Sequence, residues 1–280
     1  MDIVDSPAKM RTLAGTLRAK CGTLGLVPTM GALHEGHTSL IASAVSECAS
    51  VVVSIFVNPA QFAPTEDLDT YPRTFELDLE VCRSRGVAAV YAPTPEAMYQ
   101  DGFDTWIEVP SMSAGLCGLH RPGHFRGVVT IVAKLFNACK PDRAYFGEKD
   151  FQQFVLIRHM SEDLDFGVNV IACPIVREKD GLAMSSRNVN LSGGERERAL
   201  CLIKGLRPAK QLFLEGEKES ARLCAVVREE LEKAHAQVDY VEIIASDTLE
   251  PLESANKFAR IAVAANIGSI RLIDNLALGD

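Results

Sequence analysis

From residue 24 to residue 173, short apolar runs alternate with longer amphipathic segments. The short runs are typical of strands buried on both faces, whereas the longer segments repeat their apolar residues at helical spacing. Strands that alternate with helices form a parallel sheet covered on both faces, the doubly wound α/β arrangement. We therefore predict strands at residues 24–27, 51–57, 87–91, 143–146 and 168–173, and helices at 38–50, 74–85, 125–138 and 152–163.

The alternation stops near residues 176–190, and the pattern after Ser192-Gly193-Gly194 is different. Charged helical segments come first and strand-like runs follow, which is typical of a separate α+β unit. We predict a larger domain at residues 1–176 and a smaller α+β domain at residues 177–280. The predicted helices of the second domain are 195–213 and 220–236, and its strands are 239–244, 258–264 and 270–273.

Composition narrows the class of protein. With 280 residues, 47% of them hydrophobic and 24% charged, the chain is typical of a soluble globular protein. Its formal net charge of −8 argues against nucleic acid as a partner. No apolar run reaches the ~18 residues of a membrane span, and residues 1–20 lack the apolar core of a secretory signal. Eight cysteines without a CxxC pair predict free thiols in a reducing cytoplasm.

The segment PTMGALHEGH, residues 28–37, leads from the first predicted strand, which Pro28 should close, into a helix. A helix start has unpaired backbone N–H groups and the positive end of the helix dipole, and both favour anions. His34 and His37 are three residues apart on one face, so both can donate to one phosphate. The alternative is a structural pair of histidines. Zinc fits poorly, because metalloprotease histidines are four apart.

Polar residues also follow the strand predicted at residues 51–57. Asn58 and Gln61 each offer a donor and an acceptor, which suits a small molecule with hydroxyl and carboxylate groups. A capped Asn-Pro turn explains them equally well. Asp67 and Asp69 are candidate magnesium contacts, with a solvated loop as the alternative.

Basic residues occur at two later helix entrances. Arg121 and His124 precede the helix at 125–138, where cations and N–H groups together suit an anion, although a solvated basic loop is the usual fate of such charges. Lys149 follows Gly147 at a strand-to-helix turn and offers a compact cation to phosphate oxygens, while Gln153 can face a second substrate. A charged surface turn is the alternative.

The segment GLAMSSRN, residues 181–188, lies at the predicted domain junction. Its two hydroxyls and the guanidinium of Arg187 can close over a nucleotide triphosphate and stabilise charge that builds during displacement at phosphorus. An ordinary linker has a similar composition.

The segments PTMGALHEGH, FVNPAQF, RPGHFRGV, PDRAYFGEKDFQQ and GLAMSSRN, in this order, resemble the pantothenate synthetase (pantoate–β-alanine ligase) family. DYVEI and RLIDN resemble its C-terminal domain. The resemblance implies a Rossmann-like fold related to class I aminoacyl-tRNA synthetases, with HEGH as the HIGH signature and MSSRN as the KMSKS loop. It also implies ATP-dependent joining of pantoate to β-alanine through a pantoyl adenylate, with pantothenate, AMP and pyrophosphate as products. Magnesium and a homodimer are implied too, without metal ligands.

The resemblance also implies roles for individual residues. His37 would donate a proton or hydrogen bond to the phosphates, and His34, Lys149 and Arg187 complete the catalytic set. Because MSSRN has no counterpart of the KMSKS lysine, Lys149 and Arg187 would supply the positive charge. Gln61 and Gln153 would hold pantoate, Gln61 would also contact β-alanine, and Asn58, Arg121 and His124 are further substrate-binding candidates. The ATP-binding residues would be Met30, Gly31, Ala32, Leu33, His34, Glu35, Gly36, His37, Gly147, Glu148, Lys149, Asp150, Val176, Met184, Ser185, Ser186 and Arg187.

The chemistry of these residue types agrees with that reaction. Attack of a carboxylate on the α-phosphate brings two anions together, so cationic groups and positioning would supply most of the catalysis. No residue is an obvious base for the β-alanine amine. One rival is a nucleotidyltransferase that moves AMP or CMP onto a phosphorylated substrate, which gives Gln61 and Gln153 no clear duty. Another is a nucleotide-binding regulator without turnover, against which the four catalytic candidates count.

Overall fold

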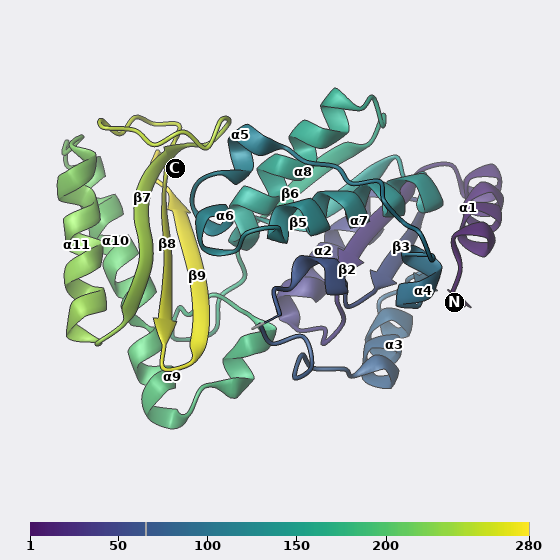
Figure 1. The fold of residues 1–280 in the computed structure, drawn as a ribbon, viewed down its shortest axis with the longest axis horizontal. Helices are drawn as coiled ribbons and strands as arrows, with labels where there is room; N and C mark the ends of the chain where they lie inside the picture. Colours follow the sequence, from purple (N-terminus) through teal and green to yellow (C-terminus); the bar gives the residue numbers. More distant parts are fainter. Residues whose placement is uncertain (65, 280) are drawn as a thin grey trace. The chain divides into compact units, whose positions relative to one another are not determined.

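In the computed structural model, which describes residues 1–64 and 66–279, six strands pair in parallel in one sheet (Figure 1). β2 pairs with β3 on one side and with β5 on the other, so the chain moves outward from β2 in both directions. Ligands of such sheets bind beyond the carboxyl ends of the strands where the direction changes. In spatial order the strands are β1 (Asp2–Val4), β4 (Ala89–Tyr91), β3 (Ser50–Ile55), β2 (Leu24–Thr29), β5 (Arg143–Gly147) and β6 (Asn169–Cys173).

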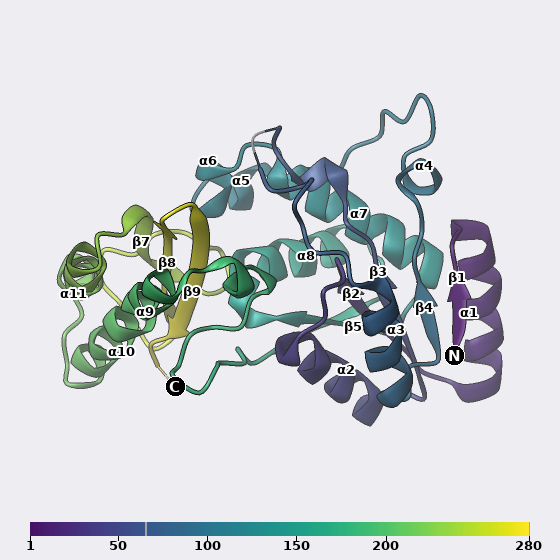
Figure 2. The ribbon, with the colours of Figure 1, turned by 90° about the horizontal axis from the view of Figure 1, so that it is seen from below.

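Helices cover both faces of this sheet, as the doubly wound prediction requires. Figure 2 shows α2 and α3 on one face and α7 and α8 on the other. α2 packs Ile41 and Ala44 against Val27 of β2 and Val53 of β3, which are register partners. The helices are α1 (Pro7–Cys21), α2 (Glu35–Glu47), α3 (Phe75–Ser84), α4 (Pro95–Met98), α7 (His124–Cys139) and α8 (Phe151–Asp163), with 3-10 turns η1 (Pro59–Gln61) and η2 (Glu148–Asp150).

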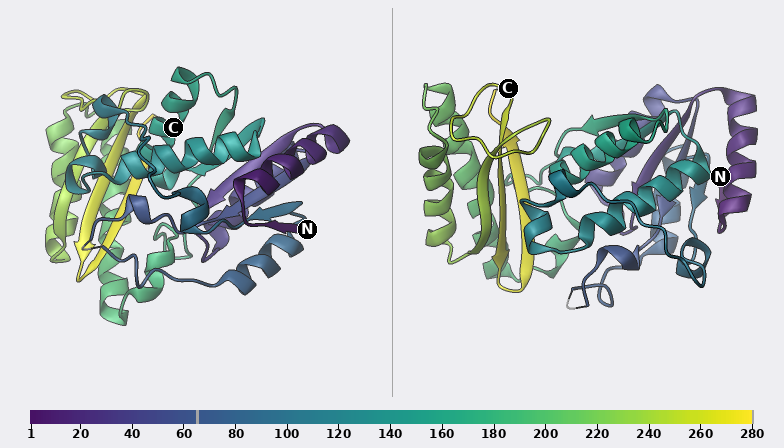
Figure 3. Two further views of the ribbon diagram at one scale, coloured as in Figure 1. Left: turned by 45° about the vertical axis from the view of Figure 1, so that its right-hand side comes forward. Right: turned by 45° about the horizontal axis from the view of Figure 1, so that its top comes forward.

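A second, antiparallel sheet has the order β7-β8-β9, and the light-green helix α11 lies on one side of it in Figure 1 and in the right-hand view of Figure 3. The amphipathic faces of α10 and α11 bury Leu206, Leu223 and Val227 against Ile261 and Val263 of the central strand. This is the predicted α+β arrangement. Its elements are α9 (Gly193–Ala199), α10 (Cys201–Leu214), α11 (Ser220–Lys233), β7 (Gln237–Ala245), β8 (Ala259–Ile267) and β9 (Ile270–Ala277), with η3 (Ser186–Asn190) before them.

Contacts between residues divide the chain into two compact units. The first comprises residues 1–110, 121–148 and 156–174, and the second comprises 111–120, 149–155 and 175–280. The short helices α5 (Pro110–Ser113) and α6 (Cys117–His120) therefore belong almost entirely to the second unit, together with the first turn of α8. The domain boundary at residues 176 and 177 stays a prediction.

Two local expectations are corrected, and two elements at the start of the chain were not predicted. β2 continues through Pro28 to Thr29. The nitrogen of Pro28 faces the β5 side of the strand, and the last residue of β2 that pairs with β5 is Leu26. The proline therefore removes no hydrogen bond between strands. The helix expected at 195–213 divides into α9 and α10 at Leu200. β1 and α1 were not predicted, although Ser6 and Pro7 are a regular N-cap and first-turn pair.

Two expectations from composition can be compared with the described residues. None of the described helices combines the length and the apolar character that crossing a bilayer requires. The cysteines described between Cys48 and Cys224 are free thiols, as the spacing predicted.

Candidate active site

The loop after β2 brings His34 and His37 together at the start of α2. His34 is the N-cap residue, and its Nδ1 accepts the N–H of Gly36 at 3.1 Å. Nδ1 of His37 in turn accepts the N–H of His34 at 3.3 Å, and the two ring centroids are 4.1 Å apart. Because both Nδ1 atoms are acceptors, Nε2 carries the proton in each neutral ring. The two rings therefore form a capping box at the helix start, and each keeps its proton on Nε2; their role towards phosphate stays a prediction.

The backbone N–H groups just before α2 have partners inside the protein. Those of Ala32 and Leu33 donate to the two carboxylate oxygens of Asp78 at 3.0 and 2.8 Å, and that of Gly31 donates to the Thr29 hydroxyl at 3.1 Å. These three residues precede the N-cap His34, so they are not the helix-start donors expected to favour an anion. Anion binding at the helix start stays a prediction.

Asn58 and Gln61 meet at the end of β3. Asn58, which is 1% exposed, caps η1 by accepting the N–H of Ala60, so the predicted capped turn is present. Its Nδ2 donates to Oε1 of Gln61 at 3.2 Å and to the Gly127 carbonyl at 3.1 Å. Nε2 of Gln61 lies 2.9 Å from Sδ of Met30. Asn58 thus orients the Gln61 amide with its oxygen towards Asn58 and its nitrogen towards Met30.

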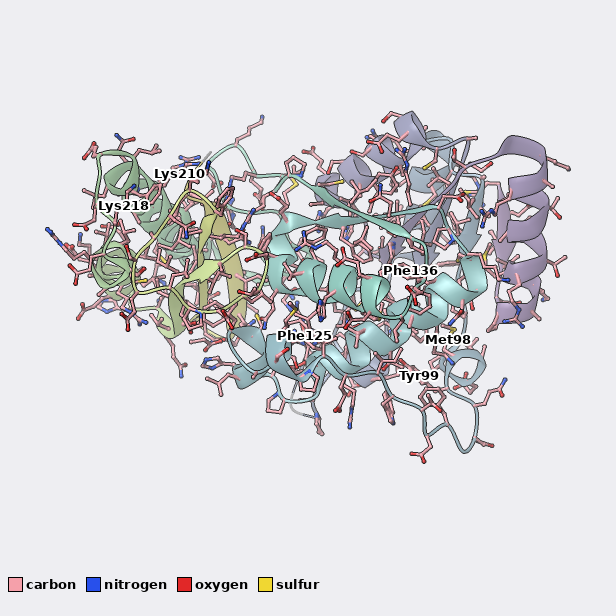
Figure 4. The ribbon with its side chains drawn as sticks, turned by 90° about the horizontal axis from the view of Figure 1, so that it is seen from above. Met98, Tyr99, Phe125, Phe136, Lys210 and Lys218 are labelled. Atoms are coloured by element: carbon pink, nitrogen blue, oxygen red, sulfur yellow. The ribbon has the colours of Figure 1, made fainter. Side chains whose placement is uncertain are left out.

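Tyr99 forms a hydrogen bond with the Asn58 side chain and was not predicted as a site residue. Its hydroxyl donates to Oδ1 of Asn58 at 2.8 Å. Burial raises the pKa of Tyr99 to about 12, against the opposing effect of the hydrogen bond to Asn58, so the hydroxyl stays a donor at neutral pH. Tyr99 follows α4 (Figure 4) and packs against Phe103 and Trp106. Nothing local in the sequence links it to a residue 41 positions earlier.

Arg121 and His124 also converge on Gln61. Both Nε and Nη2 of Arg121 lie 2.7 Å from the carboxylate of Glu66, and its Nη1 lies 3.0 Å from Nε2 of His124. His124 Nδ1 donates to the Gln61 carbonyl at 2.8 Å. Burial would raise the pKa of Glu66, but the hydrogen bonds and charge of Arg121 outweigh it and lower that pKa. The solvated-loop alternative is wrong for Arg121, whose side chain is 15% exposed.

In the second unit, Lys149 and Gln153 lie at the entrance of α8. The Lys149 carbonyl accepts Nδ2 of Asn275 at 3.0 Å, and its Nζ lies 3.8 Å from Asp150. The Arg260 guanidinium stacks over the Phe151 ring at 3.8 Å. Strand β9 therefore fixes the backbone of this turn, while Gly147 and Glu148 belong to the first unit.

The segment from Val176 to Arg187 is held by Asp274, the residue that precedes Asn275 in β9. Asp274, which has a 1% exposed side chain, forms two hydrogen bonds with Arg177 at 2.7 and 2.9 Å. The Met184 N–H donates to the Val176 carbonyl at 3.0 Å, and Ser185 caps η3 by accepting the Arg187 N–H at 3.2 Å. The segment is an ordered hairpin, so the linker alternative is wrong. Asp274 and Asn275 together hold both predicted ATP segments of this unit.

Comparison with known proteins identifies the family. The family model described as pantoate-beta-alanine ligase matches residues 2–277. The chain belongs to the pantoate–β-alanine ligase family. This confirms the resemblance that the ordered motifs indicated.

Relatives and solved structures of this family match over nearly the whole chain. The pantothenate synthetase of Thermotoga neapolitana is 49% identical over 280 residues, 100% of both chains. That of Myxococcus xanthus is 51% identical over 283 positions, covering 98% of this chain and 97% of the relative. The pantothenate synthetase structure from Thermus thermophilus has a TM-score of 0.94 at 42% identity, with 99% of each chain covered. The Rossmann-like α/β fold with a small antiparallel sheet is therefore that of a pantoate–β-alanine ligase.

A further pantoate–β-alanine ligase structure carries ligands. The enzyme from Francisella tularensis, solved in complex with beta-gamma ATP and beta-alanine, has a TM-score of 0.81 at 35% identity and covers 100% of this chain and 98% of its own.

Four residues of the present chain contact the predicted site residues but were not predicted from the sequence: Asp78, Tyr99, Asp274 and Asn275. Only the last two had a signal, since they lie in the RLIDN segment.

Proposed function

We propose that this chain acts as a C–N ligase that makes pantothenate, AMP and pyrophosphate from pantoate, β-alanine and ATP through a pantoyl adenylate. The observation that carries the proposal is family membership over residues 2–277. The ATP-dependent condensation is the activity of that family, and the adenylate intermediate is what the family resemblance implies. The Francisella tularensis relative, which was solved with beta-gamma ATP and beta-alanine, supports the choice of ligands.

In the first step a pantoate oxygen attacks the α-phosphate, the bond to the β-phosphate breaks, and pyrophosphate leaves. The Nε2–H groups of His34 and His37 would donate to phosphate oxygens, and neither ring needs to be a nucleophile. Lys149 and Arg187 would add positive charge that offsets the negative charge developing on the phosphates.

In the second step the β-alanine amine attacks the acyl carbon and AMP leaves. Gln61 would hold pantoate and β-alanine in turn, and Gln153 would hold pantoate. The contacts of Gln61 support this role, because Asn58 orients its side chain and His124 holds its carbonyl. Positioning by preset hydrogen bonds lowers the barrier without new charge at the site.

We include Mg²⁺ and a homodimer in the proposal, since the family resemblance implies them, and a cytoplasmic location, since the cysteine spacing predicts it. Within residues 1–64 and 66–279, no three His, Cys, Asp or Glu side chains are grouped around a common point. Mg²⁺ commonly uses one or two carboxylates together with substrate phosphates, so a single residue such as Asp150, whose side chain is 48% exposed, fits it. The ion would neutralise phosphate charge when it is bound.

One assay tests the function. AMP and pyrophosphate release is measured from ATP with pantoate, in the presence and absence of β-alanine. We expect sustained release with both acids and a single turnover with pantoate alone. A transferase acting on a phosphorylated substrate would not need β-alanine, and a regulator would release no AMP.

A further inference from the structure

Asp78 of α3 lies directly behind the loop that joins β2 to α2. The residue is 2% exposed. Oδ2 accepts the Ala32 N–H at 3.0 Å and Oδ1 accepts the Leu33 N–H at 2.8 Å, while the Thr74 hydroxyl donates to Oδ1 at 3.2 Å. Both oxygens are thus used by consecutive residues that immediately precede His34.

The loop has a backbone conformation that needs such support. Gly31 has φ of 81° and Ala32 has φ of 50°, so two successive residues are left-handed and one of them carries a Cβ. A Cβ at Gly31 would lie 3.0 Å from Oδ2 of Asp78. In this conformation the N–H groups of Ala32 and Leu33 both point towards the carboxylate of Asp78. The hydrogen bonds of Asp78 therefore offset the strain at Ala32.

We propose that Asp78 is a positioning residue for ATP binding: it fixes the loop so that His34 and His37 present Nε2 to the phosphates. This inference rests on the proposed function of the loop as an ATP site. The two N–H groups and the Thr74 hydroxyl donate hydrogen bonds to Asp78 and stabilise its negative charge, which reduces its repulsion of the phosphates. Asp78 itself touches no reacting atom in this scheme.

The test compares two isosteric substitutions at opposite ends of β2. Asp78→Asn replaces one acceptor oxygen by an NH₂ group that faces a backbone N–H. Asp142→Asn is the matched control, because Asp142 accepts the Leu24 N–H at 2.8 Å at the other end of the same strand. We expect the ATP dissociation constant from calorimetry to rise about tenfold or more in Asp78→Asn, with the pantoate KM within about twofold of wild type. Asp142→Asn should bind ATP as the wild type does.

A spectroscopic reading separates positioning from general stability. The ¹⁵N shifts of His37 report whether its Nδ1 still accepts the N–H of His34, and they should change in Asp78→Asn but not in Asp142→Asn. If Asp78→Asn does not fold, Thr74→Val replaces it, since it removes only the hydroxyl donor and should weaken ATP binding about threefold.

Unchanged ATP affinity and unchanged His37 shifts in the folded variant would overturn the inference, as would equal losses in both aspartate variants. A wild-type chain that binds ATP without making pantothenate would instead contradict the proposed function. The comparison of ATP affinities would still decide the role of Asp78.

Discussion

The imidazole rings of His34 and His37 keep donors on Nε2 because their Nδ1 atoms accept backbone N–H groups. In Lys149, too, a backbone group and the side chain have separate contacts. Its carbonyl accepts a hydrogen bond from Asn275, while its ammonium group lies at the end of a flexible side chain. At the scale of single residues, backbone contacts fix position, and the proposed function assigns the chemistry to other polar atoms of the same side chains. These two functions can be separated by substitution.

His37→Ala and Lys149→Ala are expected to lower kcat by roughly a hundredfold or more while the fold is retained, because each removes a donor to developing negative charge. AMP release under saturating substrates measures the effect. His159→Ala is the control, since His159 pairs with exposed Asp163 at 3.1 Å on α8. Wild-type turnover in both variants would remove the phosphate roles of His37 and Lys149.

Tyr99→Phe is expected to raise the pantoate KM about three- to tenfold, because the Asn58 amide loses the donor that fixes its orientation and Gln61 is released. The ATP KM should stay unchanged. Tyr91→Phe is a matched control: its hydroxyl contacts Met98 at 3.3 Å in the same region but does not reach Asn58. Steady-state kinetics with each substrate varied tests this, and equal effects of both variants would contradict it.

Two contacts between elements decide where the substrate residues lie. Helix α7 approaches η1 so closely at Gly127 that its carbonyl accepts the Asn58 side chain. In strand β9 the consecutive residues Asp274 and Asn275 have different partners. Asp274 binds Arg177 of the hairpin, and Asn275 donates to the Lys149 carbonyl. At the scale of elements, close packing rather than local sequence sets the geometry.

Gly127→Ala should destabilise the protein by about 1–3 kcal/mol or more, because its Cβ would overlap the Ala60 carbonyl. Gly15→Ala in α1 is the control, since a Cβ there meets nothing within 4 Å. It should stabilise the protein by about 0.5–1 kcal/mol, the difference in helix propensity. Urea unfolding of both variants measures the contrast, and a neutral Gly127→Ala would show that α7 can move from η1.

Asn275→Ala should raise the ATP KM several-fold, on the order of one lost hydrogen bond, because the Lys149 turn loses its anchor. The control is Asn266→Ala in β8, which also removes a side-chain donor from this sheet, in that case to Asp239 at 3.2 Å. It should leave the ATP KM unchanged. A similar change in both variants would indicate a general weakening of the sheet.

The molecule as a whole contains two compact units, and each has carboxylates whose pKa is lowered in the folded state. In the first, Arg121 lowers the pKa of Glu66 in spite of burial, and in the second, a hydrogen bond from Arg196 lowers the pKa of Asp180. A lowered folded pKa means that the unfolded chain binds more protons at acid pH. The stability supplied by these ion pairs is present above the ordinary pKa and is lost as pH falls through the folded value.

We therefore expect the midpoint of urea unfolding to fall as pH is lowered from about 6 to about 3. Below the ordinary pKa of 4.5 the unfolded chain takes up a proton at Glu66, whereas the folded protein, in which that pKa is lowered, takes it up only at lower pH. Glu66→Gln should be less stable at neutral pH and should lose less stability over the same range. Circular dichroism at each pH measures both curves. Parallel curves for the two proteins would show that Glu66 contributes nothing to the acid transition.

The fold could be predicted largely from local patterns. The apolar run at residues 51–57 and the helical spacing after His37 each depend on neighbours in sequence, so β3 and α2 were found with errors at their ends. Pro28 shows the limit of such patterns, because a proline ends a strand only where its nitrogen faces a partner strand. The break at Leu200 had no signal in the sequence, since no glycine or proline lies beside it.

The sequence by itself determined the α/β class, the segments that carry chemistry and the family, because periodicity and contiguous motifs are local properties. Only the tertiary structure decided which acceptors occupy the loop before α2, which donor orients Asn58, and that Arg121 is paired with Glu66. These contacts join residues separated by about forty or more positions. Their formation depends on strand order and helix packing, which no short stretch of sequence encodes.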